Sequence, residues 1–361
     1  MSAQTTVEDR RSRLSGQAGL PALHGRVTLK QGGGGRAMRA LIEKLFVREF
    51  AAMPFDGVGL AAMDDGAAIP IGSEWLIVTT DSHVIHPIFF PGGDIGRISI
   101  SGTVNDLAMM GATRLLGITC GLILEEGFPL DQLERVQRSL VDTCIEAGTL
   151  VITGDTKVMG RGEIDGIVIN TTGVALAKRV VRDNGLRAGD RIVVTGTMGD
   201  HGLAVMSARH GLQLEGDLVS DVAPIHSLIA TVLEAMPEAI TAMKDPTRGG
   251  LSSALHEMAQ KSNVGIILEE RNVPVTDAVR AAGEILGIDP LHVANEGKAV
   301  IGVRAEDAER LVALLRAHPL GRDAAIAGTC IAERPGGIIL DTGFGRRLLA
   351  EPEGEPLPRI C

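Results

Sequence analysis

The chain has 361 residues, which is too long for one ordinary core and predicts two domains. Its formal net charge of −10 argues against a general nucleic-acid role, because phosphate binding needs a basic surface. Tyrosine is absent and aromatic residues make up 2% of the chain, so the cores must be aliphatic. No apolar run approaches the length of a membrane span, and the first thirty residues hold no secretory signal. We therefore expect a cytoplasmic protein that binds neither membrane nor nucleic acid.

The first half of the chain alternates between helical and strand patterns. Apolar spacing predicts, in chain order, a helix at 35–50, a strand at 74–82, a helix at 98–112, a strand at 115–124, a helix at 130–148, and strands at 149–160 and 164–176. We expect the strand at 149–160 to run into a polar turn. Residues 1–25 are interpreted as a mobile leader.

The pattern restarts after a polar turn at 183–190. It predicts the strand RIVVTG, a glycine-rich turn and a helix, then helices at 222–236 and 249–262, a strand at 264–270, a helix at 275–286, a strand at 298–303, a helix at 305–317, and strands near 325–332 and 337–341. The fold class is therefore α/β plus α+β. We expect an N-terminal domain over 26–182, a C-terminal α+β domain over 183–345 and a flexible tail over 346–361.

Acidic side chains follow several predicted strands. They are Asp64 and Asp65 in MDDGAAIPIG, Asp81 in TTDSH, Asn105 and Asp106 in GTVNDLAMMGA, and Asp155 in TGDTK, which also holds Lys157. One acid of this kind is typical of a surface turn, but four such segments in one domain point to a cluster. Hard oxygen ligands from separate elements suit Mg²⁺ together with phosphate oxygens. The glycine run QGGGG at 31–35, at a predicted helix start, can supply backbone N–H groups for that phosphate or serve as a plain linker.

A set of motifs in order over roughly residues 30–345 carries a family resemblance. The motifs are MDDGAA, TTDSHV, PGGDIGRISISGTVNDLAMMGA, TGDTKV, TGTMGDHGLAVMS, KDPTRGGL and ANEGK. They resemble the aminoimidazole ribonucleotide synthetase superfamily of ATP-dependent enzymes, which includes selenophosphate synthetase and thiamine-monophosphate kinase. Together with the terminal PRIC, they resemble the HypE family of hydrogenase maturation proteins. The resemblance implies a two-domain PurM-like fold, a homodimer formed through the N-terminal sheet, and ATP in a cleft beside the dimer interface.

The resemblance also implies a reaction. A carbamoyltransferase partner, HypF, loads a carbamoyl group on the C-terminal cysteine, and a carbamoyl dehydratase then uses ATP to convert this S-carboxamide to an S-cyanate. The cyano group passes to iron held by a HypC–HypD scaffold complex and becomes a cyanide ligand of NiFe hydrogenase. Such a reaction needs a cation near the oxygen, a base for the nitrogen and Mg²⁺ for the γ-phosphate.

Roles for single residues follow from the resemblance. It implies metal and phosphate binding by Asp65, Asp81, Asp106 and Asp155, with cofactor contacts from Asp64, Asn105, Thr156, Gly34, Gly35 and Asp245. Lys157 would grip the carboxamide oxygen or the phosphate, and Glu296 of ANEGK would act as the base. Purely structural roles remain as alternatives for several of these residues. Lys157 can be a solvated turn residue and Glu296 a salt-bridge partner. Asp245 and Arg248 can orient the site or cap the next helix, and His201 is interpreted as structural.

The chain ends in EPEGEPLPRIC, so its last residue is Cys361. The prolines favour an extended path with few backbone donors, and we expect the glutamates at 351, 353 and 355 to keep the tail solvated. A mobile arm of this length reaches at most roughly 53–58 Å. We interpret Cys361 as the substrate carrier. Two alternatives are a selenophosphate synthetase-like enzyme, although residues 25–40 hold no cysteine, and a non-enzymatic thiol-carrying binding module.

Overall fold

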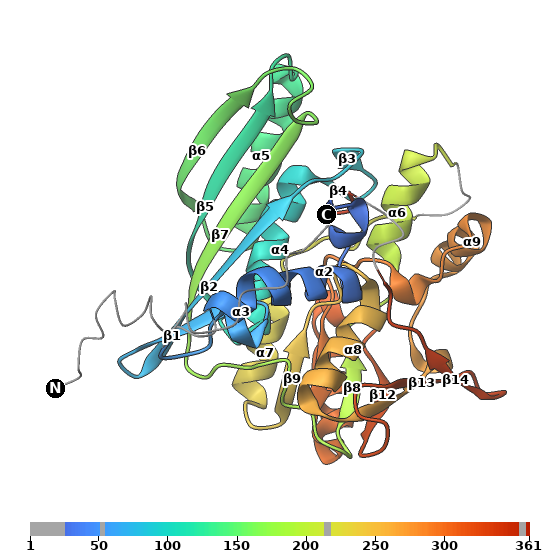
Figure 1. Ribbon diagram of the computed structural model, residues 1–361. Coiled ribbons are helices and arrows are strands. Elements are labelled where there is room, and N and C mark those ends of the chain that lie inside the picture. Colours follow the sequence, from blue (N-terminus) through green and yellow to red (C-terminus); the bar gives the residue numbers. More distant parts are fainter. Residues whose placement is uncertain (1–25, 51–54, 213–217, 354–358) are drawn as a thin grey trace.

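The computed structural model describes residues 26–50, 55–212, 218–353 and 359–361. It has two lobes, each built on its own sheet, and the C-terminus lies between them (Figure 1). The predicted leader at 1–25 lies outside the described residues. Within the part that is described, no helix is long and apolar enough to cross a membrane.

The N-terminal lobe contains a five-stranded sheet in the order β1-β2-β7-β5-β6, in which only β5 and β6 are parallel. Two helices, α4 and α5, pack along this lobe (Figure 1). The bounds are β1 Ala67–Ile71, β2 Glu74–His83, α4 Ile95–Met109, β5 Arg114–Glu125, α5 Leu130–Glu146, β6 Val151–Met159 and β7 Ile167–Ala177. Burial alternates strictly along β7, so one face of the sheet packs on α4.

Helix α4 approaches the sheet closely because small residues line the contact. It begins after Asp94, whose side chain accepts a hydrogen bond from the Arg97 N–H, a typical N-cap. A Cβ at Gly173 of β7 would lie 2.6 Å from Thr103 Cγ2 and 2.7 Å from Leu107 Cδ1. Glycine at this position therefore sets the spacing between helix and sheet, and with it the place of Asp106 near the end of α4.

The C-terminal lobe contains a seven-stranded sheet in the order β14-β13-β10-β12-β8-β11-β9, in which only β10 and β13 are parallel. Its apolar residues form two clusters, one beneath α8 and the other around α7 and α10. The bounds are β8 Arg191–Val194, α7 His226–Ala235, β9 Ile240–Lys244, α8 Gly250–Ser262, β10 Gly265–Glu269, β11 Val300–Val303, α10 Ala308–Arg316, β12 Ala325–Ile331, β13 Ile338–Asp341 and β14 Arg346–Leu349.

The remaining elements join or flank the lobes. Helix α2 crosses between them in Figure 1, and α6 and α9 pack against each other near the β3–β4 ribbon, above the C-terminal sheet in that view. The bounds are η1 Leu29–Gln31, α2 Gly35–Ile42, the π-helical turn η2 Glu43–Val47, α3 Arg48–Phe50, η3 Leu60–Ala62, β3 Phe89–Phe90, β4 Gly93–Asp94, α6 Asp200–Arg209, η4 Glu270–Asn272, α9 Asp277–Leu286, η5 Pro290–His292, η6 Ala305–Asp307 and η7 Pro319–Gly321.

The predicted helices and strands named above are present, with ends that differ by a few residues. Two expectations were wrong. Strand β6 continues through Asp155 and Lys157 because both pair in register with β5, so this segment is not a polar turn. Residues 346–349 form β14 against β13 and do not belong to a flexible tail. Strands β1 and β9 were not predicted from the sequence.

The outer strand β6 is exposed along its whole length. Its free edge carries Val151, Ile152, Val158 and Met159, and the neighbouring Leu150 is 60% exposed. An exposed, apolar edge strand is a ready surface for pairing with another chain.

Candidate active site

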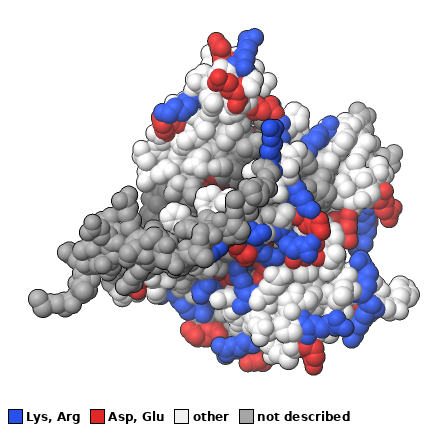
Figure 2. All heavy atoms as spheres, viewed as in Figure 1, with Lys and Arg blue, Asp and Glu red and all other residues white. Residues whose placement is uncertain are grey.

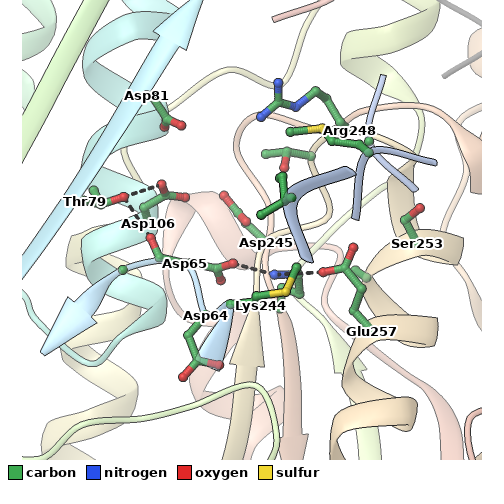
Figure 3. Close-up of a pocket in the computed structure, with 18 of the residues that line it drawn as sticks. Asp64, Asp65, Thr79, Asp81, Asp106, Lys244, Asp245, Arg248, Ser253 and Glu257 are labelled. Carbon is green, nitrogen blue, oxygen red and sulfur yellow. Dashed lines mark hydrogen bonds and ion pairs between the residues drawn. The ribbon is translucent and has the colours of Figure 1, made fainter. Parts of the chain in front are cut away.

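A cavity of about 540 Å³ lies where the two lobes meet. Both lobes contribute to its lining (Figure 3), and so does Cys361 at the end of the chain. Of the residues predicted for the site, the cavity is lined by Gly34, Gly35, Asp64, Asp65, Asp81, Asp106, Asp245, Glu296 and Cys361. Segments separated by almost the whole chain therefore meet in one place.

Thr79 on β2 joins the Asp106 carboxyl group to the backbone of Asp65 in the N-terminal lobe. The Thr79 hydroxyl lies 2.8 Å from the backbone oxygen of Asp65 and 2.9 Å from the Asp106 carboxyl (Figure 3). Burial, and then the charges of Asp81, Asp245 and Asp65, raise the pKa of Asp106 well above its usual range. The single Thr79 hydroxyl proton is shared between two acceptors, the Asp106 carboxyl and the Asp65 backbone carbonyl.

Lys244 supplies a positive charge from the C-terminal lobe. Its Nζ atom lies 2.5 Å from Asp65 and 3.3 Å from Glu257, so it holds the two lobes together across the cavity (Figure 3). Burial, with the nearby Asp65 and Asp81, raises the pKa of the next residue, Asp245, to about 8, although Lys244 opposes the shift. This part of the cavity thus holds more carboxyl groups than it has cations to balance.

Asp64 forms ion pairs with basic side chains other than Lys244. Its carboxylate accepts from Arg182 at 2.6 Å and lies 3.4 Å from Lys261 Nζ. Lys261 in turn lies 2.6 Å from Asp183, and both aspartate side chains are 1% exposed. Asp64 therefore ties the N-terminal lobe to α8 and to the connection between the domains.

Glu296 is buried, and its Oε1 atom has no hydrogen-bond partner among the described residues. Burial, followed by the charges of Asp245, Asp221 and Asp81, raises its pKa well above the usual range. Asn105 does not line the cavity. Its amide donates to the Glu296 backbone oxygen at 3.1 Å, so it positions the backbone of the segment that carries Glu296.

The glycine loop packs directly against the C-terminal lobe. Gly34 has a φ of +77°, and a Cβ there would lie 2.8 Å from the Arg248 Cβ, so both conformation and space require glycine. The first amides of α2 are engaged by the tail. Arg36 N–H donates to the Pro352 carbonyl at 3.2 Å and Ala37 N–H to the Glu353 carbonyl at 3.1 Å.

The tail before residue 354 is tied to η1 and α2 by ion pairs. Glu351 is largely buried, contrary to the expectation that it keeps the tail solvated, whereas Glu353 is 60% exposed. Glu351 pairs with Arg39, and both side chains are largely buried. Glu353 lies 2.5 Å from Lys30 and 2.7 Å from Arg36. Basic and acidic side chains lie together along the middle of the face shown in Figure 2, where the lobes meet. Residues 354–358, including Glu355, lie outside the described residues.

The last three residues are docked rather than extended into solvent. Val84 N–H donates to the Cys361 carbonyl at 3.0 Å and His86 N–H donates to the Arg359 carbonyl at 3.2 Å. The tail accepts these bonds, so its prolines, which remove donors, do not prevent docking. Cys361 is half-buried, is not in a disulfide and lines the cavity.

Asp155, Thr156 and Lys157 do not line the cavity of their own chain. They lie on the exposed strand β6, where Lys157 Nζ is 2.8 Å from Asp155 and both side chains are more than half exposed. Hydrogen bonds from Lys157 and from the Thr156 backbone lower the pKa of Asp155. Within one chain these residues are thus separate from the other predicted ligands.

Several cavity residues were not predicted for the site from the sequence: Thr79, Lys244, Ser253, Glu257 and Lys261. Lys244 stands directly before Asp245 in KDPTRGGL, and that adjacency was the available signal. Among the described residues, no group of three or more His, Cys, Asp or Glu side chains is arranged to hold a metal ion. The surplus of buried carboxyl groups at Asp65, Asp106 and Asp245 is nevertheless the donor chemistry that suits a hard cation.

Two family models match the chain and define its class. The AIR synthase related protein N-terminal domain matches residues 63–177 and the corresponding C-terminal domain matches residues 187–341, so this is a two-domain protein of that superfamily. Carbamoyl dehydratase HypE of Azotobacter vinelandii is 47% identical, over 95% of this chain and 99% of the relative. The chain belongs to the HypE family of carbamoyl dehydratases.

Solved structures agree with this assignment. A chain in the crystal structure of the HypE–HypF complex has a TM-score of 0.79 and 40% identity, covering 87% of this chain and all of that chain. The crystal structure of HypE in complex with ATP has a TM-score of 0.77 and 41% identity, covering 93% of this chain and all of that chain.

Proposed function

We propose that this carbamoyl dehydratase uses ATP to convert an S-carboxamide on its own Cys361 into an S-cyanate. One observation carries the proposal: Cys361, the last residue, lines the same cavity as the buried carboxyl groups and the glycine loop. The ATP-bound HypE structure supports nucleotide binding by a chain of this fold. The cavity thus contains both the thiol that would bear the substrate and the groups that would act on that substrate.

The reaction balances without any other reactant. ATP phosphorylates the carboxamide oxygen, the C–O bond then breaks with phosphate as the leaving group, and nitrogen gives up both protons to leave C≡N on sulfur. The products are the S-cyanate, ADP, phosphate and one proton. The chain must bind the nucleotide, exclude water and accept a proton from nitrogen.

Glu296 is our candidate for the group that accepts the nitrogen proton. It faces the cavity that Cys361 also lines, and its Oε1 has no partner within the described residues. Its raised pKa makes it a stronger base once it has lost its own proton. Asn105 and Asp221 hold its backbone, which supports a fixed position for the side chain.

Mg²⁺ fits the donor set of this cavity. Asp65, Asp81 and Asp106 would hold it together with phosphate oxygens, and Asp245 lies in the same cavity. When bound, the ion neutralises charge on the transferred phosphate. Gly34 and Gly35 would lie against the nucleotide at the start of α2, where the Arg36 and Ala37 amides would reach the phosphates only if the tail carbonyls released them.

We further propose a homodimer in which a second copy completes the cavity. The exposed apolar edge of β6 offers the contact, and Asp155, Thr156 and Lys157 lie on that same strand. In a dimer paired through this region, Asp155 of the second copy would add a metal ligand and Lys157 a cation for the carboxamide oxygen. Their exposure in one chain fits residues that act in the site of the other.

Mixing variants tests the shared site. Asp106→Ala and Asp155→Ala should each be inactive as pure dimers, but a mixed dimer has one cavity with both wild-type residues. Co-refolded mixtures should therefore recover roughly a quarter of wild-type activity, because half the dimers are mixed and each has one intact site. A mixture that stays as inactive as either parent would place both residues in the same chain's site.

The partners follow from the same chemistry. HypE–HypF complexes exist for a relative, so we propose that a HypF-type carbamoyltransferase loads Cys361. We also propose that a HypC–HypD scaffold accepts the cyano group on iron, which supplies the cyanide ligands of NiFe hydrogenase. Use of ATP fits a cytoplasmic site of action, which we propose for this chain.

ATP turnover tests the proposed activity against the alternative of a non-enzymatic thiol carrier. The carbamoylated chain should convert one ATP to ADP for each carboxamide lost, whereas the uncarbamoylated chain and Cys361→Ala should not. ATP consumption that is the same with and without the carbamoyl group would contradict the proposal.

A further inference from the structure

One face of helix α6 holds the end of the chain. His201, Val205 and Arg209 are spaced four residues apart and therefore lie on the same side of the helix. All three are placed against the last three residues: His201 and Arg209 through hydrogen bonds, and Val205 within the apolar cluster that includes Ile360. The cavity is not lined by any of the three, so their contact is with the tail and not with the nucleotide site.

His201 is fully buried and bonded on both ring nitrogens. Its Nδ1 lies 2.8 Å from Ser220 Oγ and its Nε2 lies 2.7 Å from the Ile360 carbonyl. The Ile360 carbonyl can only accept, so Nε2 must donate to it, and Nδ1 of a neutral ring then accepts from Ser220 Oγ, which itself accepts from the Val222 N–H at 3.1 Å. The network thereby assigns the proton of a neutral ring to Nε2, which donates to Ile360.

Arg209 repeats this contact at the other end of the helix. Its Nη2 donates to the Arg359 carbonyl at 2.7 Å, and its Nε donates to the His86 carbonyl at 2.9 Å. One guanidinium thus joins the tail to the segment that follows β2. Two successive carbonyls of the tail, those of residues 359 and 360, are therefore fixed by two side chains of α6.

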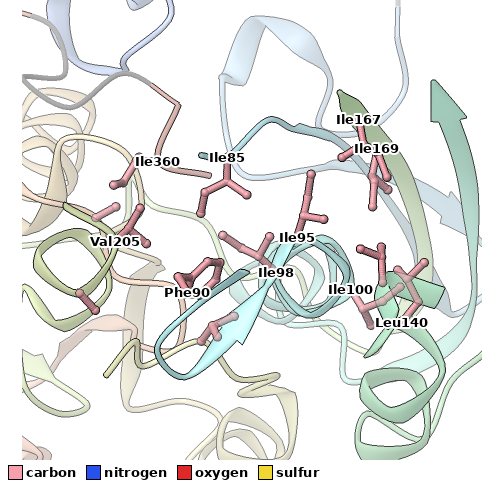
Figure 4. Packing of buried hydrophobic residues seen from close by; sticks show 14 of the residues in the cluster. Ile85, Phe90, Ile95, Ile98, Ile100, Leu140, Ile167, Ile169, Val205 and Ile360 are labelled. Atoms are coloured by element: carbon pink, nitrogen blue, oxygen red, sulfur yellow. The ribbon is translucent and has the colours of Figure 1, made fainter. Parts of the chain in front are cut away.

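The side chain of Ile360 fills the space between these two contacts. It is 2% exposed and packs in the cluster that contains Ile85, Phe90 and Val205 (Figure 4). The Phe90 ring also stands edge-on to His201, with the ring centroids 5.3 Å apart. On its other side the tail accepts hydrogen bonds from the Val84 and His86 N–H groups, so it lies between the N-terminal lobe and α6 and contacts both.

We propose that His201 and Arg209 are positioning residues, which fix the backbone before Cys361 so that its thiol group is presented to the cavity. This proposal rests on the function proposed above. The contacts are made to main-chain carbonyls directly before the reacting residue, so they set its place without touching its substituent. The same contacts must break when a partner loads the thiol. Weakening them should therefore favour loading and slow dehydration.

The first test measures docking and needs no catalysis. Alkylation by iodoacetamide, followed by intact mass, reports on Cys361 because Cys120, Cys144 and Cys330 are buried, and its rate should rise when the tail undocks because the docked thiol is half-buried. His201→Phe keeps a ring against Phe90 but removes the donor, and His201→Gln keeps a donor near the position of Nε2. We expect alkylation to be roughly two- to tenfold faster in His201→Phe, the range for one lost hydrogen bond, and close to wild type in His201→Gln.

The second test separates positioning from folding. His201→Phe should be carbamoylated at least as fast as wild type, yet dehydrate the loaded tail more slowly, and His201→Gln should restore dehydration. Arg209→Ala, at the half-buried end of the helix, should shift both readouts in the same directions and provides a second variant if His201→Phe does not fold.

The outcomes are distinct. Wild-type alkylation and dehydration rates in both His201→Phe and Arg209→Ala would overturn the proposal. Faster alkylation in the variants together with no dehydration in wild type would refute the proposed function and leave the docking contact standing.

Discussion

Lys261 offers a quantitative test of the contact between the lobes. It is shared by Asp64 and Asp183, both 1% exposed, and it also donates to the Met63 carbonyl at 2.5 Å. Burial raises the pKa of Asp183 to about 7, with the charges of Lys244 and Lys261 opposing the shift. Lys261→Met should therefore raise this pKa further, while Arg182 continues to balance Asp64.

The sign of the pH effect follows from protonation. Below about pH 7 Asp183 is protonated in both wild type and Lys261→Met, so Asp183 contributes little to the destabilisation caused by the substitution. Above that pH wild type carries the ionised carboxyl and the variant must either bind a proton or bury an unbalanced charge. The loss of unfolding free energy should then grow by up to about 1.4 kcal/mol per pH unit, or up to about 2 kcal/mol between pH 7 and 8.5.

Urea unfolding of wild type, Lys261→Met and Lys261→Arg at pH 6.5 and 8.5 measures this difference. The loss of the Met63 and Asp64 contacts should be similar at both pH values, and Lys261→Arg, which keeps the charge, should show little pH dependence. A destabilisation by Lys261→Met that is equal at the two pH values, or larger at 6.5, would refute the reasoning.

Further predictions concern the site and the dimer. Asp106→Ala and Asp155→Ala should fold but bind Mg-ATP at least about tenfold more weakly in titration calorimetry, because each removes a carboxylate from the proposed metal site; unchanged affinity would remove that residue from it. Lys157→Ala and Glu296→Gln should accept the carbamoyl group and fail to form cyanate, and normal cyanate formation would exclude the altered residue from the chemistry. Wild type should sediment as the proposed dimer in analytical ultracentrifugation and Val158→Asp as a monomer, since it puts a charge on the apolar edge of β6; a variant that remains dimeric would move the interface elsewhere.

The regular elements were predictable because their apolar residues repeat with a clear period. Strand β9 was missed because Ala242, Met243 and Lys244 are residues that favour helices, and strand β1 because it includes Pro70, which is rare inside strands. The residues of strand β14 were assigned to the tail. Its pairing with β13 depends on a sheet that the local sequence does not reveal.

The candidate site was predictable where a motif carried it, as for Asp65, Asp106 and Glu296. The role of Lys244 was not, because a lysine beside an aspartate is usually solvated and only the fold places it against Asp65. Docking of the tail could not be predicted either, since it depends on donors from Val84, His86 and α6, far away in the sequence. Composition alone describes the tail as extended and mobile.

The most direct test of the account is the intact mass of the loaded chain after a single turnover with Mg-ATP. Wild type, first carbamoylated by the carbamoyltransferase and then purified, should lose the mass of one water, and the change should map to the peptide that ends in Cys361. Cys361→Ala should never gain the carbamoyl group. A loaded wild-type chain that keeps its full mass with ATP present, or a loss of water that maps to another residue, would contradict the claim that this enzyme dehydrates a carboxamide on its own C-terminal cysteine.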